Sequence, residues 1–414
     1  MATTEPEAGG RIAGDTGPMI TARSAMTFVV LLGSVSLFSD ATYEGGRSLV
    51  GQFLQLLGSS AAAVGIAVGA GEFLGYALRL VSGYAADRTG AYWRITLLGY
   101  GINLLAMPLL AFVGRWEIAI ALLFIERIGK AIRNPARDAM LSYATKEMGR
   151  GWGYGLHEAM DQIGAFVGPL SVSLALFLRG AGNAGLADYQ AAFVILFVPA
   201  VIAVSLLLLA RRLFPHPRDL ESKTPRISAE GLGRTYWLFV IAAGFIAAGY
   251  ADFALMAFHF HAIELVSDEV IPLLFAVGMA VDAGAALVMG RLYDRSGFAV
   301  LIVAVALGAI FAPFIYFGSL PIVVVGIALW GIGLSAQESI LKAALAGIIP
   351  HERRAYGFGL FATVFGIFWF VGSATMGLLY DIEVGFLVAF SVVSQLLALP
   401  IFLVTRRRLA AGEA

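Results

Sequence analysis

The densest group of ionisable side chains in this sequence lies inside an apolar segment, residues 116–141. Four of them recur at intervals of four, three and four residues and therefore share one face of a helix: Glu126, Lys130, Arg133 and Arg137. A charge near the middle of a membrane-spanning helix costs at least about 2.5 kcal/mol, so it needs water, a partner or a function. Glu126 and its neighbour Arg127 fall near mid-depth. We expect them, together with Lys130, to take part in proton coupling or in binding a substrate.

Structural pairing is the alternative interpretation for two of these bases. Arg133 and Arg137 fall toward the end of the segment and could pair with Glu158 and Asp161 on the next segment. Such ion pairs would hold two helices together and would leave less charge free for chemistry.

Further polar groups interrupt other apolar segments: Asp40, Asp161, Asp252, Gln337 and Glu338. Asp40 and Asp252 occupy related places in the first and seventh segments. A carboxylate at such a place could load or release its proton when a cation binds or when Arg127 moves, which is a minimal exchange mechanism. For Glu338, an ion pair with Lys342 one helical turn further on is the alternative.

Metal, thiol and nucleotide chemistry find little support in the sequence. His259 and His261 project about 200° apart on a helix, which prevents them from ligating one metal ion together. The chain has no cysteine, so it forms no disulfide and offers no thiolate ligand. No nucleophile–base pair stands out, and no Walker-type phosphate-binding loop is present. We therefore expect no metal, no cofactor, no ATP-driven step and no enzyme.

A polar hairpin occurs twice, about half the chain apart, at residues 83–90 and 290–297. Both copies read Gly, three residues, Asp-Arg, any residue, Gly, and each lies between two apolar segments. Their glycines and charged residues are Gly83, Asp87, Arg88 and Gly90 in the first copy, and Gly290, Asp294, Arg295 and Gly297 in the second. This recurrence indicates a duplicated membrane bundle. A glycine turn with a solvated ion pair is the alternative for each copy.

The segment 151–178 carries small residues and a proline at helical spacing: Gly155, Gly164, Gly168 and Pro169. Gly164 and Gly168, one turn apart, allow a facing helix to approach closely, and Pro169 frees a backbone carbonyl and permits bending. Plain small-residue packing explains this pattern as well as a functional role does.

The composition predicts an integral membrane protein that is entirely helical. Of the 414 residues, 59% are apolar and only 14% are charged, against about 25% charged residues in soluble domains. The apolar length suffices for twelve membrane-spanning segments. We expect them at 25–46, 61–85, 95–114, 116–141, 151–178, 188–211, 235–262, 270–292, 298–318, 320–347, 353–380 and 385–405.

The longest polar stretch inside the chain divides these segments into two sets of six. It covers residues 212–234 and contains three prolines, so it is expected to be a cytoplasmic linker. We expect a disordered tail at 1–24 and two six-helix bundles at 25–211 and 235–408.

The distribution of positive charge predicts the orientation. Most lysines and arginines outside the segments fall on the side of the two termini and the linker, whereas the opposite side has Arg47, Arg115 and Arg179. The positive-inside rule then places both termini in the cytoplasm and the chain in the inner membrane. The net charge of zero excludes a basic arm for nucleic acid.

The hairpins, the glycine-proline pattern and the twelve segments together resemble the major facilitator superfamily of transporters, over about residues 25–408. That resemblance implies two six-helix repeats, a cavity lined by segments 1, 4, 7 and 10, and an arginine of segment 4, here Arg127, in proton coupling. It also implies that Asp87, Arg88, Asp294 and Arg295, with Gly83 and Gly90, act in gating. The first hairpin departs from the family pattern, because Ala91 and Tyr92 stand where basic residues are usual.

The glycines of segment 151–178 are similar to the antiporter signature of the same superfamily, although Val172 and Ser173 replace its last two glycines. The match favours export over import. We therefore predict a monomeric, proton-coupled exporter of small organic molecules that works by alternating access within the lipid bilayer. A transporter of a small anionic solute, by symport or exchange, is the main alternative, based on the bases of segment 116–141. A transporter-like sensor that moves nothing is a third hypothesis.

Overall fold

The computed structural model describes residues 22–148, 150–180, 184–215, 232–349 and 354–411. Within these ranges the secondary structure is helical, and no strand occurs. Residues 1–21 of the predicted tail and most of the predicted linker lie outside the described residues, whereas residues 22–24 already belong to the first helix.

In its described residues, the first half of the chain forms seven helices and one short 3-10 turn. They are α1 (Ala22–Leu56), α2 (Ala61–Thr89), α3 (Tyr92–Leu109), η1 (Leu110–Phe112), α4 (Trp116–Met148), α5 (Arg150–Leu178), α6 (Leu186–Ile195) and α7 (Phe197–Leu213). The sixth predicted segment is thus one span made of α6 and α7, interrupted at Leu196.

The second half contains more interruptions. Its elements are α8 (Arg234–Gly249), α9 (Phe253–Ala262), α10 (Val270–Ser296), α11 (Phe298–Ala309), α12 (Phe311–Phe317), α13 (Leu320–Ser335), η3 (Ala336–Ile340), α14 (Leu341–Ile348), α15 (Arg354–Ile382) and α16 (Val384–Ala410). Segment 7 is split into α8 and α9, and segment 10 contains the π-helical turn η3 between α13 and α14.

Eleven spans in the described residues are long and apolar enough to cross a membrane. The exception is α4, which has the length of a span but carries the predicted stripe of charges. With α4 included, the protein is an all-α membrane protein of twelve spans. The span that hydropathy does not recognise is therefore the one that carries this stripe of charges.

Both copies of the polar hairpin end a helix at a glycine with positive φ. Gly90 follows α2 with φ of 63° and donates its N–H to the carbonyl of Ala86. Gly297 follows α10 with φ of 58° and donates to Tyr293. Residues other than glycine rarely adopt such angles, so the last glycine of each copy is needed to end the helix.

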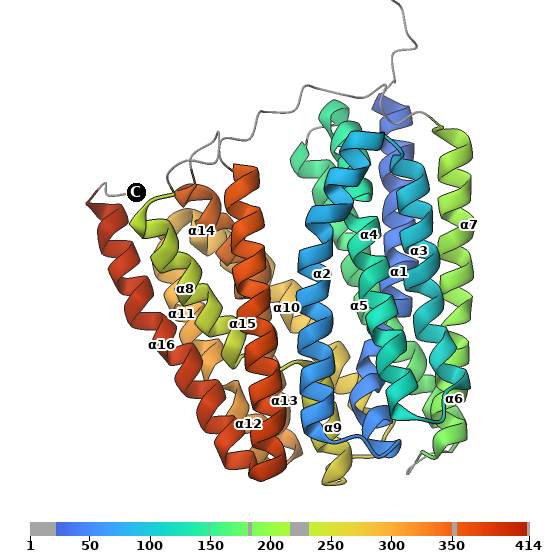
Figure 1. The fold of residues 1–414 in the computed structure, drawn as a ribbon, viewed down its shortest axis with the longest axis vertical. Helices are drawn as coiled ribbons and strands as arrows, with labels where there is room; N and C mark the ends of the chain where they lie inside the picture. The colour runs from blue at the N-terminus through green and yellow to red at the C-terminus, as the bar shows by residue number, and fades with distance from the viewer. Residues whose placement is uncertain (1–21, 149, 181–183, 216–231, 350–353, 412–414) are drawn as a thin grey trace, which may run out of the picture.

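The helices form two bundles, α1–α7 and α8–α16, that lie side by side (Figure 1). We use "terminal end" for the end at which α1 begins and α16 ends, and "distal end" for the opposite one. The bundles contact each other mainly through three helix pairs, α2 with α15, α1 with α9, and α5 with α10.

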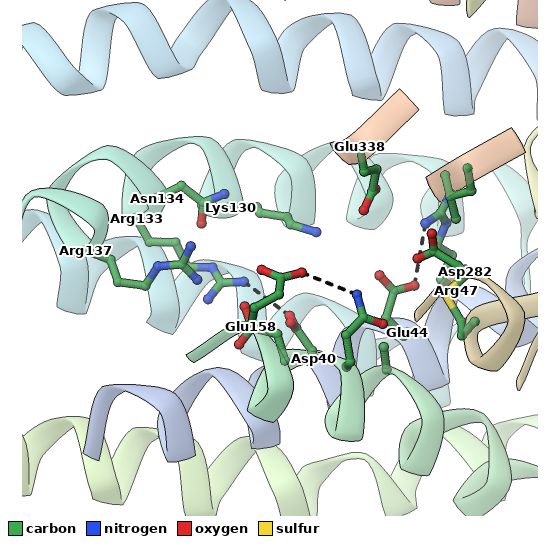
Figure 2. A pocket seen from close by; sticks show the side chains of 15 residues that line it. Asp40, Glu44, Arg47, Lys130, Arg133, Asn134, Arg137, Glu158, Asp282 and Glu338 are labelled. Atoms are coloured by element: carbon green, nitrogen blue, oxygen red, sulfur yellow. Dashed lines mark hydrogen bonds and ion pairs between the residues drawn. The ribbon is translucent and has the colours of Figure 1, made fainter. Parts of the chain in front are cut away.

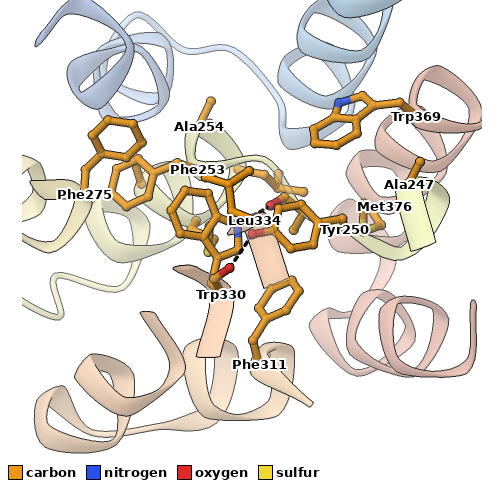
Figure 3. Packing of buried hydrophobic residues seen from close by; sticks show 14 of the residues in the cluster. Ala247, Tyr250, Phe253, Ala254, Phe275, Phe311, Trp330, Leu334, Trp369 and Met376 are labelled. Atoms are coloured by element: carbon orange, nitrogen blue, oxygen red, sulfur yellow. Dashed lines mark hydrogen bonds between the residues drawn. The ribbon is translucent and has the colours of Figure 1, made fainter. Parts of the chain in front are cut away.

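The interruption of segment 7 is stabilised by polar groups within an aromatic core (Figure 3). Asp252 caps α9 by accepting a hydrogen bond from the Ala254 N–H at 2.9 Å. The Tyr250 hydroxyl donates to the Trp330 carbonyl at 2.5 Å, and the Trp330 indole donates to the Ala251 carbonyl at 3.1 Å. Polar groups at the break therefore have hydrogen-bond partners, and these contacts fix the position of Asp252.

Hydrogen bonds join the two halves at the distal end. Asp268 accepts the Ala184 N–H at 2.7 Å, and its backbone carbonyl accepts the Gln52 amide at 3.5 Å. The Ser173 hydroxyl donates to the Glu269 carbonyl at 2.6 Å. These contacts connect α1 and α5 with the loop that precedes α10.

A second group of distal contacts connects α2 with α15 and α1 with α9. Asp381 accepts the N–H groups of Ala61 and Ala62, at 3.1 and 3.0 Å, and so places its carboxylate at the start of α2. Gly51 lies so close to α9 that a Cβ at this position would collide with the carbonyl oxygen of Ala254. The distal end is closed by direct backbone proximity as well as by hydrogen bonds.

Candidate functional site

A polar cavity of about 190 Å³ lies between the two halves (Figure 2). Its walls come from α1, α4, α5, α10, α13 and η3. The charged residues that line it are Asp40, Glu44, Arg47, Lys130, Arg133, Arg137, Glu158, Asp161, Asp282 and Glu338. The lining begins near the middle of α1 and α10 and continues along the terminal half of α4 and α5. The cavity is therefore central and reaches toward the terminal end.

The bases of α4 form one wall of this cavity. Arg133 is almost fully buried, lies 3.9 Å from a carboxylate oxygen of Asp40, and stacks over the Tyr100 ring at 4.3 Å. Arg137 pairs with Asp138 at 2.8 Å and donates to the Ser36 hydroxyl at 3.2 Å. The pairing that the sequence suggested for these two arginines, with acids of the next helix, is replaced by pairs with Asp40 and Asp138.

Lys130 lies on the same wall but in different surroundings. Its ammonium nitrogen is 3.6 Å from the centre of the Tyr43 ring. Among the described residues, it has no carboxylate oxygen within 4 Å. A cation–π contact stabilises the charge and leaves N–H donors available.

The acids of α5 interact mainly with their own helix. Asp161 lies 3.4 Å from the His157 ring, and His157 contacts the Ser36 hydroxyl at 3.1 Å. Glu158 accepts a hydrogen bond from Gln162 at 3.4 Å. This chain of polar groups reaches from α5 to α1 on the terminal side of the cavity.

The second half contributes two acids, Asp282 from α10 and Glu338 from η3. Asp282 is only 4% exposed, and apolar Met279 and Leu334 lie beside it in the wall. Gln337 is buried next to Glu338 and donates to the Gly333 carbonyl at 3.2 Å, within its own helix. Of the two predicted residues of segment 10, the structure therefore places Glu338 at the cavity, and Gln337 is not part of its lining.

Arg47 is the largest departure from the sequence-based expectation. The sequence predicted that segment 1 ends at residue 46 and that Arg47 belongs to an external loop, but α1 continues to Leu56. Arg47 is buried in this extension, 2.5 Å from Asp252 and 3.5 Å from Glu44. Asp40, Glu44 and Arg47 recur at intervals of four and three residues, so the same helical periodicity could have revealed this face.

Glu126 and Arg127 lie outside the main cavity, in a buried network between α2, α3 and α4. Arg127 pairs with Glu72 at 2.8 Å and lies 5.1 Å from the centre of the Tyr43 ring. Glu126 is 1% exposed and accepts hydrogen bonds from the Asn103 side chain. These residues, with Asp252, line a separate void of about 30 Å³ next to the Arg47–Asp252 pair.

Comparison with known proteins identifies the family. The model described as Major Facilitator Superfamily matches residues 24–297, which is more than half of the chain. This chain belongs to the Major Facilitator Superfamily. An uncharacterized protein of Mycobacterium tuberculosis is 37% identical over 386 residues, covering 91% of this chain and 92% of that one. An uncharacterized MFS-type transporter of Methanocaldococcus jannaschii is 26% identical over 367 residues, covering 86% and 89%.

Solved structures of transporters share the fold. A mutant of the nucleoside transporter NupG superposes with a TM-score of 0.74 at 13% identity, covering 91% of this chain and 99% of NupG. A bacterial homolog of the human lysosomal transporter Spinster gives a TM-score of 0.71 at 16% identity, covering 96% and 99%. Family and fold indicate a multi-pass membrane transporter rather than an enzyme.

The glycines that resemble the superfamily's antiporter signature bring two helices into close contact. A Cβ at Gly164 would collide with the Leu37 carbonyl oxygen, and one at Gly168 with that of Ala41. Gly155, in contrast, has nothing within 4 Å of an added Cβ. Pro169 lies within the continuous helix α5. The packing interpretation accounts for Gly164 and Gly168, and a link between this pattern and export stays a prediction.

The hairpin residues with an expected gating role lie at the terminal end. Arg88 and Arg295 are exposed, and the Arg88 guanidinium donates to the Tyr84 hydroxyl at 3.4 Å. The side chains of Asp87 and Asp294 lie outside the described residues. The gating role of both hairpins stays a prediction.

The histidines of α9 have partners other than a metal. The His259 ring contacts the Tyr380 hydroxyl at 2.9 Å, and the His261 ring contacts Asp268 at 2.6 Å. In the part of the chain that the structure describes, no three His, Cys, Asp or Glu side chains are grouped to hold a metal ion.

Proposed function

We propose that this member of the superfamily is a monomeric secondary transporter that exports small organic molecules from the cytoplasm in exchange for protons. The observation that carries the proposal is the central cavity, in which acids and bases from both halves face one another. Charges are retained inside a membrane bundle where they bind a solute or carry protons.

The arrangement of the two ends supports alternating access. The distal end is closed by hydrogen bonds between the halves, and the cavity reaches toward the terminal end. The bias of positive charge supports a cytoplasmic location for the terminal end. The described state then corresponds to one that is open toward the cytoplasm, as in the Spinster homolog, which was solved in an inward-facing and unoccupied conformation.

Asp40 is the residue we propose for proton coupling. It lies in the cavity wall, close to the guanidinium of Arg133 and on the helix that also carries Arg47. Protonation would remove its attraction for Arg133, and the charge of a cationic group bound elsewhere in the cavity would lower the affinity of Asp40 for a proton. Solute binding and protonation of Asp40 would then oppose each other, which is the requirement for exchange.

The test is transport in proteoliposomes under an imposed pH gradient. A cargo is first selected by a thermal-shift screen of the purified protein against classes of compounds. We expect cargo to move against the proton flux. In Asp40→Asn, exchange of labelled for unlabelled cargo should continue while the response to the pH gradient disappears. A wild-type rate that does not change with the gradient overturns proton coupling.

Arg127→Ala tests the buried network next to this site. We expect it to abolish coupled transport while the protein stays folded, because Glu72 would lose its partner and Tyr43 its neighbouring cation. Glu117→Gln is the control, because Glu117 is exposed and pairs only with exposed Arg115 in the described structure. Full coupled activity in Arg127→Ala would reject a role for this network.

Transport of a small anionic solute is the second candidate, and Lys130 is the observation that favours it, since no carboxylate of the described residues is within 4 Å. Arg133 and Arg137 favour it less, because both have acidic neighbours. Inhibition of cargo transport by simple dicarboxylates but not by diamines would select this candidate.

A further inference from the structure

We propose that the cavity binds a zwitterion, with its anionic group at Lys130 and its ammonium group at Asp282 and Glu338. This inference rests on the proposed transport function and specifies its substrate class. It depends on which charges of the cavity have partners within the protein and which have none.

The bases of the cavity fall into two groups, those with a nearby carboxylate and those without one. Arg47, Arg133 and Arg137 each have a carboxylate oxygen within 4 Å. Among the described residues, Lys130 contacts the face of the Tyr43 ring, which holds the cation without using its hydrogen-bond donors. Glu44 and Asp40 act on its charge from more than 4 Å away, and each lies closer to an arginine. Among the cavity bases of the described structure, Lys130 is therefore the one left to bind an anion.

The acids divide in the same way. Asp40 and Glu44 lie near Arg133 and Arg47, and Asp161 lies near His157. Glu158, Asp282 and Glu338 have no basic nitrogen of the described residues within 4 Å. Glu158 accepts a hydrogen bond from Gln162 of its own helix. Asp282 is only 4% exposed, so its carboxylate is not solvated as it would be on a protein surface. Asp282 and Glu338 are therefore the two cavity acids left to bind a cation.

The unpartnered charges of opposite sign come from opposite halves. Lys130 extends from α4 into the cavity, and Glu338 and Asp282 reach the same cavity from η3 and α10 (Figure 2). A simple anion would satisfy only the first wall and a simple cation only the second. A molecule with both charges satisfies both, and it connects the two halves that must move relative to each other during transport.

Two acids facing one ammonium group are chemically consistent. An ammonium ion has three N–H donors, so it can bind two carboxylates and one further acceptor. Met279 and Leu334 provide apolar surface beside these acids, suited to a short hydrocarbon chain between the charged groups. The inferred ligand is thus a small amino acid-like zwitterion with a short apolar spacer.

Binding of matched probes to the purified full-length protein tests the inference. The probes are α,ω-amino acids of increasing length (4-aminobutyrate, 6-aminohexanoate and 8-aminooctanoate), each with the diamine and the dicarboxylate of equal length. At one length or more, we expect the amino acid to bind at least about tenfold more tightly than both counterparts, as two charged hydrogen-bond contacts imply. A diamine or a dicarboxylate that binds as tightly as the amino acid at every length, or no binding by any amino acid, overturns the inference.

Two variants test which residue binds which charged end of the ligand. Lys130→Gln should remove the advantage of the amino acid over the diamine, and Asp282→Asn should remove its advantage over the dicarboxylate. Lys130→Arg should restore the preference in part, because the positive charge is retained. Arg115→Gln, at an exposed distal site, should leave all affinities unchanged. An unchanged preference in both Lys130→Gln and Asp282→Asn also overturns the inference.

These binding measurements need no gradient, so they are independent of the coupling test. Amino acid-selective binding without gradient-driven transport would reject proton coupling and keep the substrate class. Gradient-driven transport of a cargo with no such preference would reject the substrate class and keep the transporter.

Discussion

The two ends of the interface between the halves use polar groups in opposite ways. At the distal end, Asp268 and Asp381 each have donors from the other half within hydrogen-bonding distance. Toward the terminal end, Lys130, Asp282 and Glu338 line a cavity without ion-pair partners among the described residues. The comparison shows that satisfied charges hold the halves together, whereas unsatisfied ones are available to a ligand.

The two ends also differ in how closely the helix backbones of the two halves approach each other. Glycines bring helices of the two halves into direct contact at the distal end, as Gly51 does with α9 and Gly65 with Ser373 of α15. The cavity walls carry charged side chains instead, such as Lys130, Arg133 and Glu158. Closing the terminal end would require the charged walls to meet, and a ligand with matching charges lowers the free energy of that state.

The largest expected effect comes from Gly51→Ala. The added methyl group would collide with the backbone of Ala254, and only a separation of α1 from α9 can relieve this contact. We expect the distal end to open and transport to be lost. Gly75→Ala is the matched control, since a Cβ at Gly75 meets nothing within 4 Å.

Distances between spin labels measure this change, and the absence of cysteine makes any introduced cysteine a unique label. Labels at Ile118→Cys and Ile382→Cys report on the distal end, and labels at Thr89→Cys and Ser296→Cys report on the terminal end. In Gly51→Ala the distal distance should increase and the terminal one decrease. Unchanged distributions would show that backbone contact does not hold the distal end closed.

The next largest effect is expected for the pair of Arg47 with Asp252. Removing one partner of a buried ion pair typically costs about 3–5 kcal/mol, because the other charge stays buried alone. Arg47→Gln and Asp252→Asn should each lower the free energy of unfolding by that order. The double variant should lose less than the two single ones combined, because it leaves neither charge unpaired.

Equilibrium unfolding in detergent gives the required free energies. Asp252→Asn retains an oxygen that can cap α9, so its effect reports mainly on the ion pair. Arg115→Gln removes an exposed pair and should cause no measurable change. Additive losses in the double variant would contradict a direct coupling between the two residues.

The pH dependence of the distal end should be governed by Asp268, which precedes α10. Burial alone would raise the pKa of Asp268, but hydrogen bonds from the His261 ring and the Ala184 N–H, with the charge of His261, lower it overall. Tyr189 and Glu269 also face this group. Because its pKa in the folded state is below the unfolded value of about 3.9, its contribution is complete above that pH and disappears as the pH falls through the lower value.

We therefore expect the distal spin-label distance to stay constant from neutral pH down to about pH 4, and to increase only below it. Asp268→Asn should show a looser distal end at neutral pH and no such acid transition. Opening of the wild-type protein between pH 5 and 7 would point to a titrating histidine instead.

The smallest expected effect is that of Asp381→Asn. Its carboxylate interacts with the first N–H groups of α2, and the amide keeps one acceptor but loses the charge. Charges at helix ends contribute about 0.3–1 kcal/mol, so distal closure should weaken by a similar amount. Glu383→Gln changes an exposed acid just beyond α15 and serves as the control. An effect as large as that of Arg47→Gln would mean that Asp381 has a further role.

The helical segments could be read from the sequence because hydropathy and helix termination are local properties. The ends of α2 and α10 follow from glycines with positive φ, and these glycines are visible in the repeated hairpin. Boundaries inside polar stretches were less accurate, since charges paired in the fold resemble loop residues. Arg47 was assigned to a loop for this reason, although Asp252 satisfies its charge within the bundle.

The cavity could be predicted only in part. Asp40, Lys130, Asp161 and Glu338 do line it, but Glu126 and Arg127 point into a network with Asn103 and Glu72. Helical periodicity places residues on a face and does not say which neighbouring helix covers that face. Glu126 and Lys130 share a stripe, yet one meets α3 and the other the cavity.

The sequence by itself determined a duplicated, twelve-span helical membrane protein, because apolar length, helical period and glycine termination act within one segment at a time. Only the tertiary structure decided which charges have partners. Ion pairs form within a few ångströms, so their choice depends on the rotation and approach of helices far apart in the chain. That choice joined Arg47 to Asp252 across the two halves and left Lys130, Asp282 and Glu338 facing the cavity.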